Sequence, residues 1–382
     1  MTTRYSSSCL TACSRFQYFQ HSQYTHIQHN TAYTSRQYSF TKNASKTASK
    51  NRPTQPPPPR FILTPKPADE KTTTSSTLNP PPTTRPPPLD LPTRGKESYP
   101  VYLYRIGRAT GTFYKDGLKN VWHNHKAASA LKKRIVVALN ARKPDLAPPV
   151  SASKTWSSFR DEAVQRRVLS RAEFQLLERN ARDIGKLPFF ALLVLLFGEW
   201  LPLLVPFIPN RVPGTCRIPK QVRGMREKSE ARRRWSFRSG VAEPGAGQVA
   251  TGEGGKWRMT DRASVGEVLK SLGSEQLMHL SCVLGQHSGV WDRVQLTPPA
   301  ALIRRGVCKR VQYLALDDFL IIEAGGIENL ASEELVVACE ERGIDVLGKP
   351  EEKLKAELQA WIKKQESDEG RGWAMIEMLF KR

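Results

Sequence analysis

The apolar residues of this chain concentrate in one segment, Leu187–Pro209, in which Glu199 is the only ionisable side chain. As a helix the segment would extend about 34 Å at 1.5 Å per residue, which is enough to cross a hydrocarbon core about 30 Å thick. The pattern predicts a single transmembrane helix. A buried core helix is the alternative, although such a helix seldom stays apolar around its whole circumference. Interior prolines kink helices, so Pro202 and Pro206 are expected to bend or break the second half.

Glu199 lies just before this weak point. An acidic side chain within a membrane usually faces a partner or a water-filled cavity, because contact with lipid is costly. Glu199 is therefore a functional candidate. Two other interpretations stay open: the side chain lies near an interface, or it is protonated and has no further role.

A second apolar pattern lies nearer the C-terminus. Ile303, Val307, Val311 and Leu314 recur at the spacing of one helix face. The same stretch contains a local basic cluster, and its members are the candidates for contact with phosphate groups: Arg304, Arg305, Lys309 and Arg310. A solvated helix face that forms ordinary salt bridges is the other interpretation.

A pair of helices is predicted after this cluster. Ser332 is placed as an N-cap, and Gly343 can end the first helix in the left-handed conformation. Pro350 suits the first turn of a second helix, in which Leu354, Leu358 and Trp361 or Ile362 share a face. This helix, link and helix resembles a SAP-type motif. Because its helices carry many glutamates, a packing or protein-binding role is favoured over direct DNA binding.

The N-terminal residues have a different composition. Met1 to Ala68 contains no acidic residue, several basic residues, and many Ser, Thr, Gln and Tyr, which is typical of a mitochondrial transit peptide. The sequence Arg36-Gln37-Tyr38-Ser39 resembles the pattern that a matrix protease cuts, with an arginine shortly before the cut. Cleavage there would release a chain that begins at Ser39, so the predicted transit peptide is 1–38. A disordered basic tail is the alternative.

The remaining boundaries follow from composition. A disordered spacer rich in Pro, Ser and Thr is predicted over 39–98, with order beginning near Tyr99. A pre-membrane helical region (99–186) then precedes the span (187–209). Beyond the span we expect a basic and Gly-rich linker (210–263), an all-α domain (264–366) and a C-terminal tail (367–382). The predicted fold class is thus mainly α, with a single transmembrane helix, an all-α domain and a disordered N-terminus.

Charge refines the expected partners. The chain carries a formal net charge of +23, which favours nucleic acid or anionic lipid as a partner. Residues 264–366 nevertheless contain 12 basic and 16 acidic residues, so the positive charge lies elsewhere. The 24 residues after the span hold eight basic side chains and the 24 before it hold six. This difference weakly favours the matrix for the C-terminal side.

No pattern of catalytic or metal-binding residues stands out. The six cysteines are scattered, without a Cys-x-x-Cys pair, and we find no nucleophilic set or dinucleotide fingerprint. Gly252-Glu253-Gly254-Gly255-Lys256 faintly resembles a phosphate loop, but its polar flanks favour a linker. The chain is not expected to be an enzyme, and no cofactor or metal is predicted.

Three pieces of the chain resemble the LETM family of mitochondrial inner-membrane proteins, and they occur in the family's order. The first is Tyr114 to Trp122. The second runs from Leu169-Ser170-Arg171 through Leu187-Pro188-Phe189 and Glu199 to Phe207-Ile208-Pro209-Asn210 and Pro213-Gly214-Thr215. The third runs from Ser271 to Ile362 and includes Asp317-Asp318 and Arg342-Gly343. Together they cover roughly Tyr99 to Lys364.

The resemblance implies a single-pass inner-membrane protein whose C-terminal, LETM-type domain lies in the matrix and contacts the mitochondrial ribosome. It also implies a link to the insertion machinery for mitochondrially made proteins. The alternative is a subunit of a potassium (cation)/proton exchange system, in which homo-oligomers surround a path lined by Glu199, since one span cannot enclose a pore. Expected partners are the ribosome, inner-membrane lipids and the insertion machinery. No EF-hand loop is found, so calcium regulation is not expected.

Overall fold

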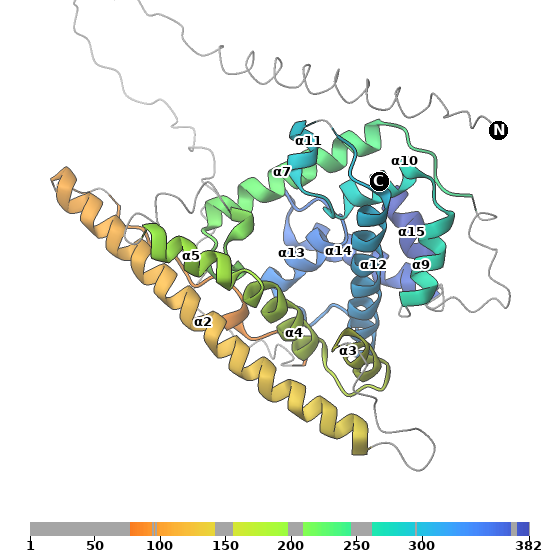
Figure 1. Ribbon diagram of the computed structural model, residues 1–382, viewed down its shortest axis with the longest axis horizontal. Helices are drawn as coiled ribbons and strands as arrows, with labels where there is room; N and C mark the ends of the chain where they lie inside the picture. The colour runs from red at the N-terminus through yellow and green to blue at the C-terminus, as the bar shows by residue number, and fades with distance from the viewer. Residues whose placement is uncertain are drawn as a thin grey trace, which may run out of the picture. The chain divides into compact units, whose positions relative to one another are not determined.

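The computed structural model describes residues 77–93, 95, 98–141, 156–197, 209–245, 262–294, 296–367 and 373–381. All regular secondary structure in these ranges is helical (Figure 1), as the mainly α prediction requires. Contacts separate a short segment, Ser288–Pro298, which contains α11 (Gly289–Val294), from the remaining described residues. Those remaining residues form the main unit, and the rest of this section concerns that unit. The predicted transit peptide lies outside the described residues.

The predicted pre-membrane region is helical where it is described. Helix α2 (Tyr99–Ala141) is 43 residues long and buries a row that includes Val121, Ala128 and Ile135. A spacing of seven residues returns to the same face of an α-helix, so one side of α2 is apolar along its length. That side packs on α4 (Arg171–Ile184), while α3 (Trp156–Gln165) packs on α2 and α12.

Helix α4 begins where its sequence allows a capping box. The Ser170 hydroxyl accepts from the Glu173 backbone N–H at 3.4 Å, and the Glu173 carboxylate accepts from the Ser170 backbone N–H at 3.1 Å. Each side chain satisfies a backbone donor that a helix start leaves without a partner. The helix therefore starts at a fixed residue, which fixes the direction of the side chains on its buried face.

Order begins earlier than predicted, because part of the proline-rich spacer packs on the helices. Leu78 is 1% exposed, and η1 (Pro82–Thr84) follows it. The Asn79 side chain donates to the Asn329 carbonyl at 2.8 Å and accepts from the Ala331 backbone N–H at 2.8 Å. The prediction of disorder through residue 98 was therefore wrong for residues 77–93. One buried leucine and a few hydrogen-bonding side chains are enough to order an extended segment on an existing surface.

Only the first part of the predicted transmembrane segment is described. It forms α5 (Leu187–Phe197), while residues 198–208, including Glu199, lie outside the described residues. Two short turns follow, η4 (Pro209–Arg211) and η5 (Gly214–Cys216). Among the helices that the structure describes, none combines the length and apolar character needed to cross a bilayer.

The predicted linker contains a packed helix. Helix α7 (Pro219–Arg238) occupies much of its first half and packs on α10 (Ser274–Val283). The linker prediction was wrong here because the basic composition concealed an inner face. Pro219 starts the helix at a position where proline's missing N–H costs nothing, and Glu230, Arg233 and Ser236 are buried. Most of the Gly-rich stretch, 246–261, lies outside the described residues.

Helix α12 (Ala300–Glu323) is at the centre of the C-terminal half. It packs on α9 (Arg262–Ser271), α10, α4 and α14 (Glu351–Ser367) (Figure 1). The predicted apolar face is confirmed, since its four members are buried: Ile303, Val307, Val311 and Leu314. This face contributes to one apolar core shared by α2, α4, α9, α10, α12, α13 and α14.

The predicted pair of helices is confirmed with a shift of one residue. Helix α13 (Ser332–Glu341) has Ala331 rather than Ser332 at its N-cap. Gly343 has a φ of 82°, as expected of the residue that ends the helix. Helix α14 begins after Pro350, and its predicted shared face is buried: Leu354, Leu358, Trp361 and Ile362.

The residues predicted to be a C-terminal tail include a further helix. Helix α15 (Trp373–Phe380) packs on α10 and α14, and Met375, Ile376 and Leu379 are buried. Its eight residues are too few to show a periodic pattern clearly in the sequence, so the segment was mistaken for a tail.

Candidate functional site

The four basic residues predicted to act together on α12 are divided by the fold. Arg305 and Lys309 are exposed, and Arg304 and Arg310 are half-buried. Arg304 donates from Nε to the Leu269 carbonyl at 3.2 Å, which ties α12 to α9. Two members of the predicted cluster therefore face solvent, and the other two belong to the packing of the domain.

Arg310 is held by a specific environment. Its guanidinium lies 3.4 Å from the Glu341 carboxylate and donates to the Glu341 carbonyl at 3.3 Å. It also lies 4.9 Å from the centre of the Tyr313 ring, a distance at which a cation and an aromatic face attract. Glu341 accepts a hydrogen bond from the Tyr313 hydroxyl at 2.7 Å. Arg310 is therefore engaged within the fold rather than presented to a partner.

A network of buried charges joins α4, α12 and the end of α13. Arg171 Nε donates to Asp317 Oδ1 at 2.9 Å, and both side chains are at most 1% exposed. Arg342 donates from Nη2 to Asp317 Oδ2 at 2.8 Å and from Nε to Asp318 Oδ1 at 2.8 Å. Trp361 Nε1 donates to Asp318 Oδ2 at 2.9 Å, which adds α14 to the network.

The two neighbouring aspartates of this network differ in acidity. Burial favours the neutral form of Asp317, but Arg171 and Arg342 outweigh this effect and lower its pKa well below the ordinary value. Burial raises the pKa of Asp318, and the opposing attraction of Arg342 does not fully compensate. Two arginines thus hold Asp317 ionised within the core. We interpret the network as structural, because each of its charged groups is occupied by another.

The sequence contains all of these residues, but nothing in it indicates that they contact one another in the folded chain. Leu169-Ser170-Arg171, Asp317-Asp318 and Arg342-Gly343 all belong to the pieces that resemble the LETM family, and no role was assigned to them. Arg171 and Asp317 are 146 positions apart. Spacing along the chain does not indicate such a pair. A charged residue within an otherwise apolar helix face is a weak indication that its side chain is buried with a partner.

Helix α7 provides the largest basic surface of the described linker region. It has eight basic and two acidic residues. On its inner side, Arg233 donates from Nε to the Val283 carbonyl at 2.8 Å and from Nη2 to the Glu340 carbonyl at 2.7 Å. Arg226 pairs with the Glu340 carboxylate at 2.8 Å. Arg234 is exposed but pairs with Glu230 and Asp345, both at 2.9 Å. The outer side exposes four other basic side chains, of which Arg223 pairs with the exposed Glu227 at 2.9 Å: Lys220, Arg223, Lys228 and Arg238.

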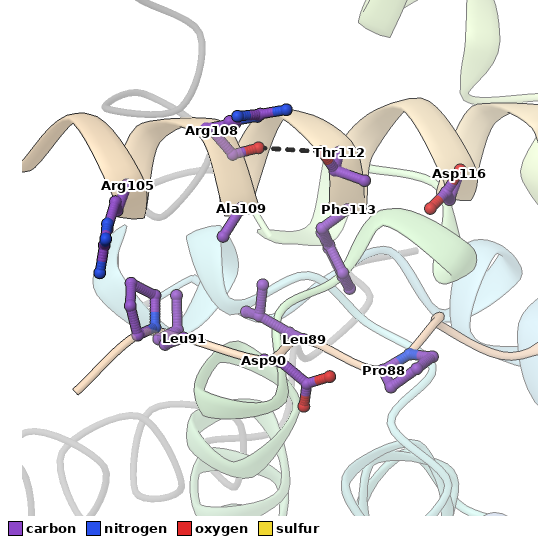
Figure 2. Close-up of a pocket in the computed structure, with 11 residues that line it drawn as sticks. Pro88, Leu89, Asp90, Leu91, Arg105, Arg108, Ala109, Thr112, Phe113 and Asp116 are labelled. Carbon is purple, nitrogen blue, oxygen red and sulfur yellow. Dashed lines mark hydrogen bonds between the residues drawn. The ribbon is translucent and has the colours of Figure 1, made fainter.

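The outer side of α2 is also basic and includes an exposed Trp122. A groove of about 480 Å³ lies between α2 and the proline-rich residues Pro88–Pro92. Figure 2 shows Leu89, Ala109 and Phe113 pointing toward one another, and Asp90 pointing away from α2. Leu89 packs on the apolar cluster that contains Phe113, and Arg105, Arg108 and Asp116 of α2 also line the groove. This geometry attaches the proline-rich segment to the helix without assembling a reactive set of side chains.

The two ends of the apolar segment lie together. Asp183 Oδ1, at the end of α4, accepts from the Gly214 backbone N–H at 2.7 Å. The Arg211 guanidinium lies 5.3 Å from the centre of the Phe189 ring. Phe190 of α5 is buried in a small apolar cluster with Phe113 and Tyr114 of α2 and with residues that follow the segment, Val212 and Cys216.

A family model described as the pentamidine resistance factor domain matches residues 98–324, from the start of α2 to the end of α12. The chain belongs to this family. The match includes α4, α7 and α12, and therefore the basic side of α7 and the part of the buried network formed by Arg171, Asp317 and Asp318, whereas Arg342 and Trp361 lie beyond it. No solved structure shows significant similarity to this pentamidine resistance factor domain protein.

Two curated relatives agree with the LETM-family resemblance. The mitochondrial proton/calcium exchanger protein of Drosophila melanogaster is 26% identical over 228 residues, which cover 51% of this chain and 21% of the relative. The LETM1 domain-containing mitochondrial protein mdm28 of Schizosaccharomyces pombe is 29% identical over 224 residues, covering 51% of this chain and 45% of the relative. The chain thus matches less than half of each relative's length. Membership of the LETM family, predicted from the sequence, is confirmed.

Proposed function

We propose that this protein is attached to the mitochondrial inner membrane and holds the mitochondrial ribosome near it, supporting membrane insertion of mitochondrially made proteins. Two observations support the location. Both curated relatives are named as mitochondrial proteins, and the first 68 residues have transit-peptide composition. The apolar segment Leu187–Pro209 supplies the attachment to the membrane, and its orientation places the C-terminal helices in the matrix.

The observation that carries the ribosome-binding proposal is the exposed basic side of α7. Ribosomal RNA presents dense phosphate, and affinity for it comes largely from lysine and arginine. On α7 these side chains extend from a helix whose other side is fixed by buried hydrogen bonds of Arg233. A fixed helix loses little conformational freedom when it binds, so more of its electrostatic attraction appears as affinity.

Helix α12 contributes a smaller part of the proposed contact. Arg305 and Lys309 remain exposed there, so they are available to phosphate groups. Arg304 and Arg310 are excluded from this role because they are half-buried and their guanidinium groups bond to the Leu269 carbonyl and to Glu341 within the fold. The proposed binding residues are therefore Lys220, Arg223, Lys228, Arg238, Arg305 and Lys309.

Co-sedimentation with mitochondrial ribosomes tests the proposal. Replacing Lys220, Arg223, Lys228 and Arg238 by Gln should weaken sedimentation and flatten its salt dependence. Each lost phosphate contact lowers the slope of log affinity against log salt by about 0.7 to 0.9, so four contacts lower it by about 3. Replacing Arg305 and Lys309 by Gln should lower the slope by about 1.5.

The matched control removes four exposed charges elsewhere: Lys270, Arg293, Lys353 and Lys363, each replaced by Gln. This variant should sediment as the unmodified chain does. Equal losses of ribosome binding in the α7 variant and the control would show that binding depends on the total positive charge of the chain and not on the surface of α7. Unchanged ribosome binding, together with weaker binding of the α7 variant to cardiolipin vesicles, would assign the surface to lipid and overturn its proposed role.

A cation/proton exchange function is the second candidate, and the name of the Drosophila relative favours it. In this version several copies surround a path lined by Glu199. Vesicles containing the purified chain should then exchange potassium or calcium for protons, and Glu199→Gln should abolish exchange while ribosome sedimentation is retained. Exchange that is absent from the unmodified chain, or that persists in the variant, would exclude this role for Glu199.

A further inference from the structure

Helix α2 has a long outer face that the other described helices of the main unit leave exposed. In Figure 1, α3, α4 and α5 lie on one side of α2, and the buried residues Val121, Ala128 and Ile135 belong to its inner side. On the opposite side, residues spaced by seven or four positions return to the same face. Five of them are basic and exposed: Arg108, Lys115, Lys119, Lys126 and Lys133. This basic line extends over about 38 Å, at 1.5 Å per residue.

Bulky apolar side chains are exposed on the same face. Trp122 lies three residues after Lys119 and four before Lys126, so its indole ring lies between cations of the adjacent turns. It is 63% exposed, and Val137, four residues after Lys133, is 68% exposed. An exposed tryptophan among lysines suits a partner in which an apolar layer lies beneath charged groups, because Trp is enriched at membrane–water interfaces.

The charge of α2 is almost entirely of one sign. Residues 99–141 contain eight basic residues and one acidic residue. The acidic residue, Asp116, lines the groove beside Pro88–Pro92. The five cations of the basic line therefore share a helix with a single carboxylate, and the face attracts anions from outside the chain.

Among anionic partners, a bilayer matches this face better than a nucleic acid does. The basic line has four lysines and one arginine, whereas recognition of nucleic acids favours arginine. Bases can stack on an exposed Trp122, but they offer no apolar layer for Val137. A bilayer offers anionic headgroups to the lysines and an interfacial layer to the tryptophan.

A contact between α2 and α5 keeps this face near a membrane. Phe190, in the first turn of α5, is buried in one cluster with Phe113 and Tyr114 of α2. Helix α5 is the described part of the segment that supplies the proposed membrane attachment. A surface tethered beside a bilayer meets the headgroups at a high effective concentration, so individually weak contacts are enough for binding.

We propose that the outer face of α2 is a second, peripheral lipid-binding surface, in which the lysines contact the phosphate groups of anionic lipids and Trp122 enters the interfacial layer. The partner is an anionic bilayer, such as one that contains cardiolipin. The inner side of α2 stays packed on α4, so binding requires no refolding. This inference goes beyond the proposed function and rests on it only for the attachment to a membrane.

A fluorescent probe on α2 tests the contact. The full chain, with Cys9 and Cys13 replaced by Ser, receives Ala130→Cys, between Lys126 and Lys133, and is labelled there with a nitrobenzoxadiazole maleimide. The four remaining cysteines are buried, which limits labelling elsewhere. The matched control carries the probe at Ala356→Cys, an exposed position of α14. Both chains are reconstituted into phosphatidylcholine vesicles with or without cardiolipin.

Cardiolipin should increase the fluorescence of the probe at position 130 and shift its emission to shorter wavelengths, while the probe at position 356 should not respond. Added salt should reverse the change, because salt screens charges at a surface. A quencher attached to the lipid headgroup should act more strongly than one at the end of an acyl chain, since the contact is peripheral.

Substitutions then identify the residues that make the contact. A lysine near an anionic surface strengthens binding about fivefold, so the loss of four weakens it on the order of several hundredfold. The response at position 130 should therefore disappear when four lysines are replaced by Gln: Lys115, Lys119, Lys126 and Lys133. Trp122→Ala should reduce the response. The matched control replaces four exposed cations elsewhere by Gln and should retain it: Lys270, Arg293, Lys353 and Lys363.

Flotation of the vesicles, measured on the same samples, separates this inference from the proposed function. A chain that floats with the vesicles while its probe at position 130 ignores cardiolipin would overturn the role of α2 and leave the membrane attachment intact. A chain that floats with neither vesicle would overturn both. A full response in the four-lysine variant, or a probe that responds to ribosomes in place of cardiolipin, would also overturn the assignment of this face to lipid.

Discussion

Asp317 is bonded to two arginines, one 146 positions before it and one 25 positions after it in the sequence. Arg171 and Arg342 both donate to its carboxylate, and all three side chains are almost completely buried. Removing charges from water is costly, so such a group is stable only while its partners are complete. Gln175 and Trp361 donate further hydrogen bonds to Asp317 and Asp318, respectively.

Asp317→Asn should destabilise the protein by about 3 to 5 kcal/mol, because two buried guanidinium groups lose the same negative charge. Chemical denaturation followed by circular dichroism measures the loss. Glu227→Gln is the control, since Glu227 forms an exposed pair with Arg223 and such pairs contribute less than about 1 kcal/mol. Comparable losses of unfolding free energy in both variants would show that the buried network contributes no more to stability than an exposed ion pair does.

A substitution at Gly117 tests the close packing of α2 against the turn η5, which follows the apolar segment. An alanine there would place its Cβ 2.8 Å from Cys216 Sγ and the Thr215 carbonyl oxygen. We expect Gly117→Ala to lower stability by about 1 to 3 kcal/mol, as other overpacked sites do. Gly111→Ala, in the same helix with no atom within 4 Å of the added Cβ, should instead stabilise the helix by up to about 1 kcal/mol. Thermal denaturation distinguishes the two, and changes of the same sign would contradict the close approach.

Among the elements, α7, α10 and α15 meet at one buried histidine. His279 of α10 lies 2.8 Å from the Ser236 hydroxyl of α7 and 3.1 Å from the Leu379 carbonyl of α15. The rings of Phe237 and Phe380 pack on it at centroid distances of 4.9 and 4.6 Å. Burial lowers the pKa of His279 below its ordinary value, and its two hydrogen bonds only partly oppose this effect.

This environment predicts a loss of stability in mild acid. The unfolded chain binds a proton at His279 near the ordinary pKa of 6.5, and the folded chain binds it only at lower pH. The contribution of the neutral His279 to the free energy of unfolding is therefore fully present above pH 6.5 and decreases as the pH falls below that value. Denaturation midpoints measured from about pH 7.5 to about pH 5.5 should decline in the unmodified chain and decline less in His279→Gln. Parallel profiles would show that His279 does not cause the decline.

The elements differ in how well the sequence predicted them. The buried face of α12 and the helices around Gly343 and Pro350 were predicted correctly, because apolar spacing and helix-end residues carry local signals. Helix α7 was missed because its inner face contains Glu230, Arg233 and Ser236 instead of apolar residues. Its burial depends on partners such as the Val283 carbonyl, which only the folded chain supplies.

The candidate site was predicted only in part for the same reason. Helical spacing placed Arg305 and Lys309 on a face away from the apolar residues of α12, and both are exposed. Arg304 and Arg310 were predicted to act with them, but the Leu269 carbonyl engages Arg304 and Glu341 engages Arg310. The basic character of Arg211 to Arg234 was visible in the sequence, whereas the division of α7 into a fixed inner side and an exposed outer side was not. Long-range pairs such as Arg171 and Asp317 have no local signature.

At the scale of the whole molecule, buried contacts link regions that the sequence divided into separate domains. Cys216 lies in the cluster with α2 and α5, and Cys339 lies in the core with α12 and α14. Burial raises the pKa of Cys216 to about 11 and that of Cys339 to about 12. Both thiols should therefore react slowly in the folded state, since the thiolate is the reactive form.

If the main unit unfolds as one cooperative structure, Cys216 and Cys339 should become reactive at the same denaturant concentration. Pulse labelling with a maleimide, with peptide-resolved mass spectrometry, measures each site separately. Labelling of the folded chain at both sites should be slow relative to a denatured sample. Midpoints that differ clearly would show that the region around α2 and the helices after residue 262 unfold independently.

The 146 positions between Arg171 and Asp317 also constrain how the protein matures. A growing chain contains α4 long before α12, and non-local pairings of this kind form slowly. During that interval the inner face of α4 has no permanent partner, and chaperones are the expected temporary one. A product truncated between the apolar segment and α12 would keep the exposed leucines of α5 but lose the core to which α12 contributes, which makes it a clear target for protein quality control.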